Sequence, residues 1–137
     1  MTERRLIISG TREALSAEER DLVLDIVRLY ADLGWVLGVG DCFRRRRDGS
    51  PIVNVDWLVH ITWPEARVFY ADWDRLGDAA GPERNGRMGA WAREVSEASL
   101  GAFPGPQSRG TWDCIGQWRR ARALRPELGL IVQAVGR

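Results

Sequence analysis

Glycine-rich turns that carry hydroxyl and arginine side chains recur along this sequence, each soon after a short apolar run. They are Ser9-Gly10-Thr11-Arg12, Gly40-Asp41-Cys42, and the segments 72–87 and 104–111. Glycine lets a ligand approach the backbone closely, and exposed amides at the start of a helix carry partial positive charge. These turns therefore suit a negatively charged group such as a phosphate.

The turn Ser108-Arg109-Gly110-Thr111 combines a hydroxyl, a guanidinium and bare amides just before a predicted helix. Arginine can hold a phosphate through two parallel hydrogen bonds. A single glycine-rich turn also occurs for folding reasons alone. The prediction of an anion site therefore depends on whether the turns meet at one place.

The hydrophobic pattern predicts five strands that alternate with four helices. We expect strands over residues 6–10, 35–39, 66–71, 100–103 and 128–135, and helices over 17–33, 51–62, 82–96 and 110–124. Ser16 and Glu19 form a capping box at the start of the first helix, and Pro51 is suited to start the second. Residues 72–81 are expected to form a loop or short turn.

This alternation predicts an α/β fold, a Rossmann-like doubly wound sheet of about five mostly parallel strands with helices on both faces. The whole chain, residues 1–137, is expected to be a single domain. In an open parallel sheet, ligands bind beyond the carboxyl ends of the strands, near the switch in strand order. The glycine-rich turns should therefore meet there.

Composition excludes several classes of chemistry. All 20 basic residues are arginine, so a Walker-type phosphate lysine and a lysine Schiff base are absent. Cys42 and Cys114 are too few for a disulfide framework or a zinc site of usual spacing, and we expect both to be small buried side chains. No metal and no cofactor is predicted.

Charge and hydropathy limit the partners. The net charge is +1, so nucleic acid is not expected as the main partner. No apolar run approaches the roughly 20 residues that cross a bilayer, and the first residues lack a signal-peptide core. We expect a cytoplasmic protein without a membrane partner. Exclusive use of arginine is typical of GC-rich coding genomes, as in actinobacteria and their phages.

Several motifs resemble those of one family. The string Ala80-Gly81-Pro82-Glu83-Arg84-Asn85-x-x-Met88 resembles the "AGPxRNxxM" signature of YspA-type proteins of the SLOG superfamily, and Ile8-Ser9-Gly10-Thr11-Arg12 is similar to their opening turn. Gly40-Asp41 with Asn54-Val55-Asp56 is similar to their "GDARG-AD" region, although Arg44–Arg47 is inserted and Asn54 replaces a glycine. Ala71-Asp72-Trp73 and Phe103-Pro104-Gly105 with Ser108-x-Gly110-Thr111 complete a resemblance over nearly the whole chain.

The resemblance implies a Rossmann-like fold that binds a nucleotide or a nucleotide derivative, related to the Lonely-guy phosphoribohydrolases and to the DprA Rossmann-like domain. Relatives commonly pair, so it admits a homodimer, although no spacing in this chain indicates one. The residues expected to contact the ligand are Ser9, Gly10, Thr11, Arg12, Gly40, Asp41, Asp56, Arg84, Asn85, Gly105, Ser108, Arg109, Gly110 and Thr111.

Whether the chain is an enzyme stays open. In the phosphoribohydrolase branch an arginine and a glutamate cleave the N-glycosidic bond, and here Arg84 matches the arginine while Cys114 stands at the glutamate position. Cysteine does not replace a carboxylate at neutral pH. Asp113 lies one helical step away, about 100° around the axis. If the chain is a hydrolase, its catalytic residues would be Arg84, Asp113 and Asp41, with Asp56 as a further carboxylate.

Several residues have a structural alternative to a functional role. Arg84 could contact a phosphate or be a solvated residue in a helix's first turn, and Asn85 could contact the ligand or stabilise its loop. Asp41 could accept from ribose or cap a turn. His60, the only histidine, is expected to be packed or exposed rather than catalytic, and Met88 is expected in the core.

Other side chains leave similar alternatives. Trp73 and Trp112 could stack on a base, with core packing as the default expectation. The run Arg44–Arg47 is expected to be a solvated loop or to lie over the phosphate end of the site. Three functions remain: a nucleotide sensor or sequestering module, in a phage or anti-phage setting; a nucleoside 5'-monophosphate phosphoribohydrolase; and a protein-interaction module without a ligand.

Overall fold

The computed structural model describes residues 2–136. Its elements in chain order are β1 (Arg4–Gly10), α1 (Ala17–Asp32), β2 (Val36–Gly40), α2 (Val55–Thr62), β3 (Arg67–Phe69), α3 (Trp73–Leu76), the 3-10 turn η1 (Gly77–Ala79), α4 (Ala80–Ala92), β4 (Glu97–Phe103), α5 (Arg109–Leu124) and β5 (Gly129–Val132).

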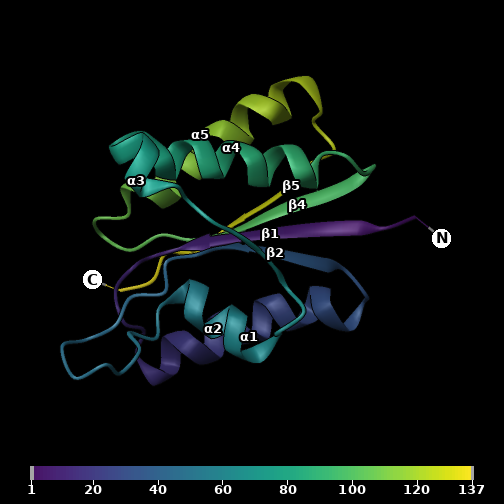
Figure 1. Cartoon of the computed structure of the whole chain (residues 1–137). Helices are drawn as coiled ribbons and strands as arrows, with labels where there is room; N and C mark the ends of the chain where they lie inside the picture. The colour runs from purple at the N-terminus through teal and green to yellow at the C-terminus, as the bar shows by residue number, and fades with distance from the viewer. Residues whose placement is uncertain (1, 137) are drawn as a thin grey trace.

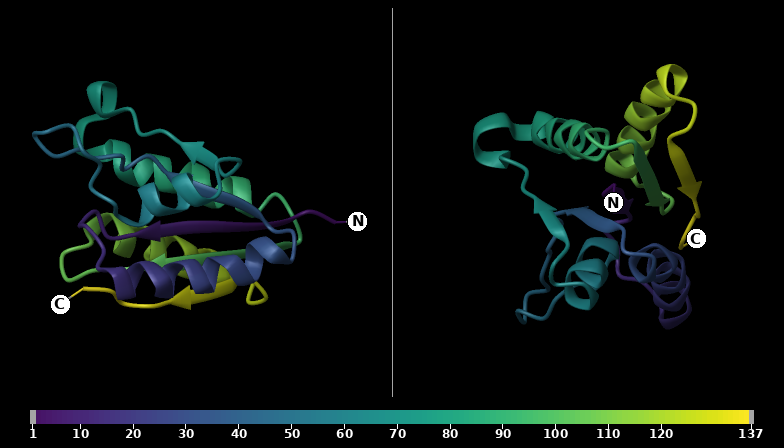
Figure 2. Two further views of the ribbon diagram at one scale, coloured as in Figure 1. Left: turned by 90° about the horizontal axis from the view of Figure 1, so that it is seen from below. Right: turned by 90° about the vertical axis from the view of Figure 1, so that its right-hand side faces the viewer.

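The strands form one parallel sheet with the order β3-β2-β1-β4-β5. Helices α1 and α2 cover one face, and α3, α4 and α5 lie on the other (Figures 1 and 2). This confirms the predicted doubly wound α/β fold. The chain moves outward from β1 in one direction and then returns to add β4 on its other side. The strand order therefore switches between β1 and β4, where such sheets bind ligands.

The sheet separates two apolar cores. Val23 and Val27 of α1 pack with Leu58 and Val59 of α2 against one face. On the other face, the buried side chains come from α4, α5 and the sheet, and include Met88, Trp91, Leu100, Ile115 and Trp118. Strands β1 and β4 are buried on both faces, so their sequences read as nearly continuous apolar runs.

Helix α1 begins where the sequence predicts. The Ser16 hydroxyl accepts from the backbone N–H of Glu19, whose carboxylate accepts from the Ser16 N–H. The predicted capping box is confirmed, because these two bonds satisfy donors that the first helical turn leaves without partners.

Helix α2 begins four residues later than predicted. Asn54, rather than a residue near Pro51, is its N-cap, and the Asn54 amide oxygen accepts from the N–H of Trp57. Pro51 instead forms an isolated antiparallel bridge with Arg45. Residues 44–52 therefore fold as a short hairpin, which the prediction of a helix start at Pro51 did not anticipate.

The segment predicted as a loop contains helical structure. Asp72 caps α3 by accepting from the N–H of Arg75, and η1 follows directly. Helix α4 then begins at Ala80 and ends at Ala92, so the predicted range 82–96 is displaced toward the C-terminus. Among residues 2–136 there are thus five α-helices, where the sequence predicts four.

The remaining differences concern element ends and two side chains. β4 is longer than predicted because it pairs with the full length of β1, from Arg4–Glu97 to Gly10–Phe103. β3 and β5 are shorter, as befits the two edges of the sheet. Trp73 and Trp112 are 44% and 48% exposed, so the expectation of core packing is wrong for both.

The lone histidine is packed among aromatic rings. The His60 ring centroid lies 4.8 Å from that of Phe43 and 6.1 Å from that of Trp57. The sequence allowed either a packed or an exposed His60, and the structure shows it packed.

Within residues 2–136, no helix has both the length and the apolar character needed to cross a bilayer.

Gly10 is required by packing at the end of β1. A Cβ at this position would lie 2.3 Å from Cγ2 of Val55, at the first residue of α2. Gly10→Ala should therefore lower the free energy of unfolding by about 2 kcal/mol, because the helix must move away from the sheet. Urea unfolding followed by circular dichroism measures this.

Gly116→Ala is the matched control, because its Cβ would meet only the end of Arg120 at 3.5 Å. Gly116 lies inside α5, where alanine is favoured over glycine by about 0.5–1 kcal/mol. The control should be at least as stable as wild type. Equal stability of the Gly10→Ala variant and wild type would contradict the close packing of α2 on β1.

Candidate functional site

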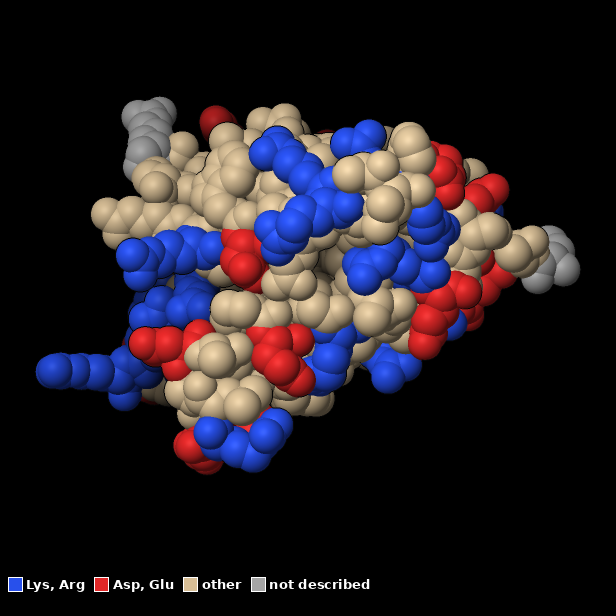
Figure 3. All heavy atoms as spheres, turned by 90° about the horizontal axis from the view of Figure 1, so that it is seen from above, with Lys and Arg blue, Asp and Glu red and all other residues tan. Residues whose placement is uncertain are grey.

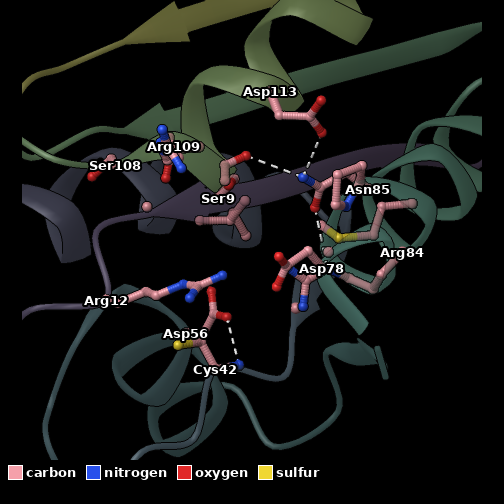
Figure 4. A pocket seen from close by; sticks show the side chains of 18 of the residues that line it. Ser9, Arg12, Cys42, Asp56, Asp78, Arg84, Asn85, Ser108, Arg109 and Asp113 are labelled. Carbon is pink, nitrogen blue, oxygen red and sulfur yellow. Dashed lines mark hydrogen bonds between the residues drawn. The ribbon is translucent and has the colours of Figure 1, made fainter. Parts of the chain in front are cut away.

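A cavity of about 490 Å³ lies among the segments that follow β1, β2 and β4, between α4 and the start of α5 (Figure 4). This volume is in the range of small-molecule sites. All four predicted turns contribute to its wall. The lining residues are Ile8, Ser9, Gly10, Arg12, Gly40, Cys42, Asp56, Trp73, Asp78, Gly81, Pro82, Arg84, Asn85, Met88, Gln107, Ser108, Arg109, Gly110, Thr111 and Asp113.

Most of the residues expected to contact a ligand line this cavity. Those in its wall are Ser9, Gly10, Arg12, Gly40, Asp56, Arg84, Asn85, Ser108, Arg109, Gly110 and Thr111. Thr11, Asp41 and Gly105 stand behind it. Thr11 is buried, and its hydroxyl accepts from the N–H of Glu13 and would lie 2.8 Å from a Cβ on Gly105. Gly105 therefore serves the packing of Thr11.

Gly40 serves the protein's own side chains in the same way. A Cβ there would lie 2.9 Å from Nη1 of Arg84 and 3.1 Å from Oδ2 of Asp56. The missing side chain gives these two charged groups room at the end of β2. The space beside the Gly40 backbone is therefore filled by the protein's own Arg84 side chain.

Arg84 is buried and ion-paired, so the alternative of a solvated arginine on a helix's first turn is wrong. Its Nη1 donates to Oδ1 of Asp41 at 2.7 Å, and its Nε donates to Oδ1 of Asn85 at 3.1 Å. Asp41 also accepts from the N–H of Ala71. The Arg84 guanidinium therefore holds the end of β2 and the segment after β3 against α4.

Asn85 links α4 to α5. Its Nδ2 donates to the carbonyl of Gly110 and to Oδ2 of Asp113, at 3.1 and 3.0 Å. The same Asp113 oxygen accepts from Nε2 of Gln117 at 2.8 Å. Arg84 and Asn85 are adjacent in sequence, so one turn of α4 ties together the ends of two strands and a helix around the cavity.

Asp113 lies in the cavity wall, whereas Cys114 faces the core. Figure 4 shows the Asp113 carboxylate directed toward Asn85 at one end of the cavity. Burial raises the pKa of the Cys114 thiol to about 12, despite a hydrogen bond with Ser9. The helical step of about 100° between them thus brings the carboxylate, rather than the thiol, to the cavity.

Asp56 is a buried carboxyl group in the wall opposite. Burial raises its pKa, while a hydrogen bond from the N–H of Cys42 and the nearby charge of Arg84 act in the opposite direction. Figure 4 shows the Arg12 guanidinium directed toward this carboxyl group. Burial therefore makes Asp56 easier to protonate than an exposed carboxyl group.

The start of α5 gives the cavity its positive end. The first turn of a helix leaves N–H groups without intrahelical partners, and the Ser108 side chain does not cap them. Its hydroxyl instead accepts from the N–H of Gly105 at 2.7 Å. Arg109 is exposed here, and none of the described residues forms an ion pair with it.

The cavity includes four residues that the sequence did not indicate as ligand contacts, namely Asp78, Gln107, Cys42 and Met88. Trp73, for which stacking on a base was one of two alternatives, also lines it. Trp73 and Asp78 come from α3 and η1, in the segment predicted as a loop. Recognising Asp72 as an N-cap would have placed Trp73 on a helix. Cys42 is half-buried rather than buried, and burial raises the pKa of its thiol to about 11.

Neither a metal site nor a known relative accounts for this cavity. Among residues 2–136, no three histidine, cysteine or acidic side chains gather so as to hold a metal ion. Comparisons with protein-family models, curated proteins and solved structures found no match. The function must therefore be argued from the geometry and the motifs.

The raised pKa of Asp56 predicts how stability changes with pH. A folded-state pKa above the unfolded value means that stability falls as pH rises through the interval between the two. Asp56→Asn imitates the protonated form and should have a higher melting temperature than wild type at pH 7. The difference should vanish toward about pH 3, where both states of wild type are protonated. Melting temperatures across this pH range test it.

The amide oxygen that this substitution introduces can still accept from the Cys42 N–H, so this bond does not confound the comparison. Asp25→Asn is a control on the exposed side of α1 and should show no such pH-dependent difference. A lower melting temperature of the Asp56→Asn variant at pH 7 would contradict a raised pKa of the buried Asp56 carboxyl group.

Proposed function

We propose that this chain binds a phosphorylated nucleotide or nucleotide derivative in the 490 Å³ cavity, as a sensor or sequestering module. One observation carries the proposal. The uncapped start of α5, the guanidinium of Arg109 and the exposed ring of Trp73 all border the same hollow, at the switch in strand order.

The phosphate fits the end formed by α5. Its first-turn N–H groups and Arg109 supply donors to negatively charged oxygen. Ser108 does not compete for these donors, because its hydroxyl is used by Gly105. Arg84 contributes less charge, since Asp41 already neutralises it.

The base and ribose fit the side of α3. The Trp73 ring is 44% exposed, so a base could stack on it. The Arg12 guanidinium lies 5.6 Å from the centre of this ring and would hold it in place. Asp78 is exposed in the same wall, where its carboxylate can accept from ribose hydroxyls.

The motifs support the same proposal from the sequence. We propose membership of the YspA-type branch of the SLOG superfamily, whose Ala-Gly-Pro-x-Arg-Asn string here forms the start of α4. In this chain Gly81 packs under the Trp73 ring, with a Cβ position 3.3 Å from Cη2. The motif thus supplies both the buried Arg84 network and the support for the aromatic wall.

Nucleoside 5'-monophosphates should stabilise the protein, because a ligand that binds only the native state raises its melting temperature. At a hundredfold excess over Kd the gain is about 2.7 kcal/mol, a shift on the order of 10 °C. Arg109→Ala should weaken binding about tenfold, since it removes a charge-assisted hydrogen bond. Differential scanning fluorimetry and titration calorimetry measure the two effects.

Arg119→Ala is the matched control, because Arg119 is exposed on the same helix but does not line the cavity. It should bind as wild type does. If no nucleotide shifts the melting temperature, the binding proposal is wrong, and a protein-interaction module becomes the better description.

A phosphoribohydrolase is a second candidate, favoured by the position of Asp113. N-glycosidic cleavage needs a carboxylate near the ribose, and Asp113 supplies one in the cavity wall although Cys114 replaces the glutamate of the resembling enzymes. Asn85 and Gln117 both donate to its Oδ2 and so hold the carboxylate in place at this wall. Asp56, with its raised pKa, could supply the proton for the leaving base.

This activity would appear as release of free base from a nucleoside 5'-monophosphate, followed by chromatography. Asp113→Asn should then reduce the rate at least about a hundredfold, because general acid–base groups contribute that much. The variant retains hydrogen-bonding groups for Asn85 and Gln117, so the fold should be kept. Binding without base release from any of these nucleotides would exclude the hydrolase.

A further inference from the structure

A second, smaller cavity of about 210 Å³ lies beside the first. Its wall is formed by Arg12, Asp41, Cys42, Phe43, Arg44, Trp73 and Arg84. Arg12, Cys42, Trp73 and Arg84 also line the larger cavity. The contact between Arg12 and Trp73 therefore stands in a wall that both cavities share.

This second cavity has an excess of positive charge. Three arginines face a single carboxylate, and that carboxylate, Asp41, is already paired with Arg84. Arg12 and Arg44 have no ion-pair partner within the described part of the chain. The two cations would gain from an anion placed between them.

The larger cavity differs in composition, because three carboxyl groups line it beside three arginines. Arg12, Arg84 and Arg109 stand against Asp56, Asp78 and Asp113. Arg109 lies at the start of α5 with the helix amides, and Nη2 of Arg12 would lie 3.7 Å from a Cβ on Gly110 there. Figure 3 shows arginine side chains at the left end of this face, interspersed with acidic ones, and further arginines toward its middle. The start of α5 with Arg109, and the smaller cavity with Arg44, are therefore two positive regions that have Arg12 in common.

The backbone holds Arg44 in position. Its carbonyl accepts from the N–H of Ile52 at 2.9 Å and from Nε1 of Trp57 at 3.0 Å. The Phe43 ring next to it packs on Trp57 with centroids 4.8 Å apart. The inserted hairpin is thus tied to α2, and its first arginine is directed to the cavity wall.

We propose that the ligand carries two separate anionic groups, one bound at the start of α5 and the second in the smaller cavity between Arg12 and Arg44. The proposal rests on the nucleotide-binding function above and narrows it to nucleotides with a second phosphate away from the 5' position. The base and sugar would lie against Arg12 and Trp73, the two residues in contact that line both cavities.

Titration calorimetry with the whole protein tests this, using 5'-monophosphates and 3',5'-bisphosphates of the common ribonucleosides. The preferred nucleoside should bind at least about tenfold more tightly as its bisphosphate. Arg44→Ala should abolish this gain and leave monophosphate affinity within about twofold. Its backbone carbonyl is retained, so the hairpin should stay folded, which circular dichroism and melting temperature check.

Arg47→Ala is the matched control, since it removes the same charge from the same hairpin but from a residue outside both cavities. It should leave both affinities unchanged. Equal binding of monophosphate and bisphosphate, or an equal effect of the Arg44 and Arg47 substitutions, overturns this inference and leaves nucleotide binding standing. If neither ligand binds, both proposals are wrong.

Discussion

The buried guanidinium of Arg84 must have a carboxylate beside it, because an unpaired charge at this depth would cost several kcal/mol. Asp41 supplies that carboxylate from the end of β2, and Gly40 leaves the space for it. The neighbouring Asn85 then bonds to the start of α5. Arg84 and Asn85 thus fix the distances from α4 to the end of β2 and to the start of α5. The cavity lies between these elements.

The same pairing decides where charge remains available. Arg84 lies at the centre of the site, but its charge is largely used within the protein. Asp56 is driven toward its neutral form by burial. The Arg84–Asp41 pair at the centre therefore adds little net charge to the site. Around it lie Arg109, Arg12 and Arg44, cations that no carboxylate of residues 2–136 pairs with. This distribution supports a ligand that is anionic at its ends and uncharged between them.

The overall architecture could be predicted because it depends on local patterns. Short apolar runs that alternate with amphipathic segments predict a parallel sheet. The Ser16–Glu19 capping box predicts a helix start from the local sequence alone. The glycine turns after the strands converge because parallel strands end at one edge. Most of the cavity wall follows from these two features.

Other parts of the site depend on contacts between distant residues. Asp41 and Arg84 are 43 residues apart, and no local pattern shows that they pair. The direction of Asp113 follows from how α5 is rotated on the sheet, and that rotation is set by core residues such as Ile115 and Trp118. The exposure of Trp73 follows from α3, which has too few residues to give a periodic signal.

The hairpin of residues 44–52 is held by main-chain groups, by Trp57, and by the side chains of Arg45 and Arg46, which donate to the carbonyls of Gly49 and Pro51. Arg46 and Ser50 pair through their backbones, as do Arg44 and Ile52. Residues 44 and 47 can therefore change identity during evolution with little loss of stability. Selectivity for different ligands could diverge at this hairpin among descendants of one ancestor, while the sheet and the Arg84 network stay the same.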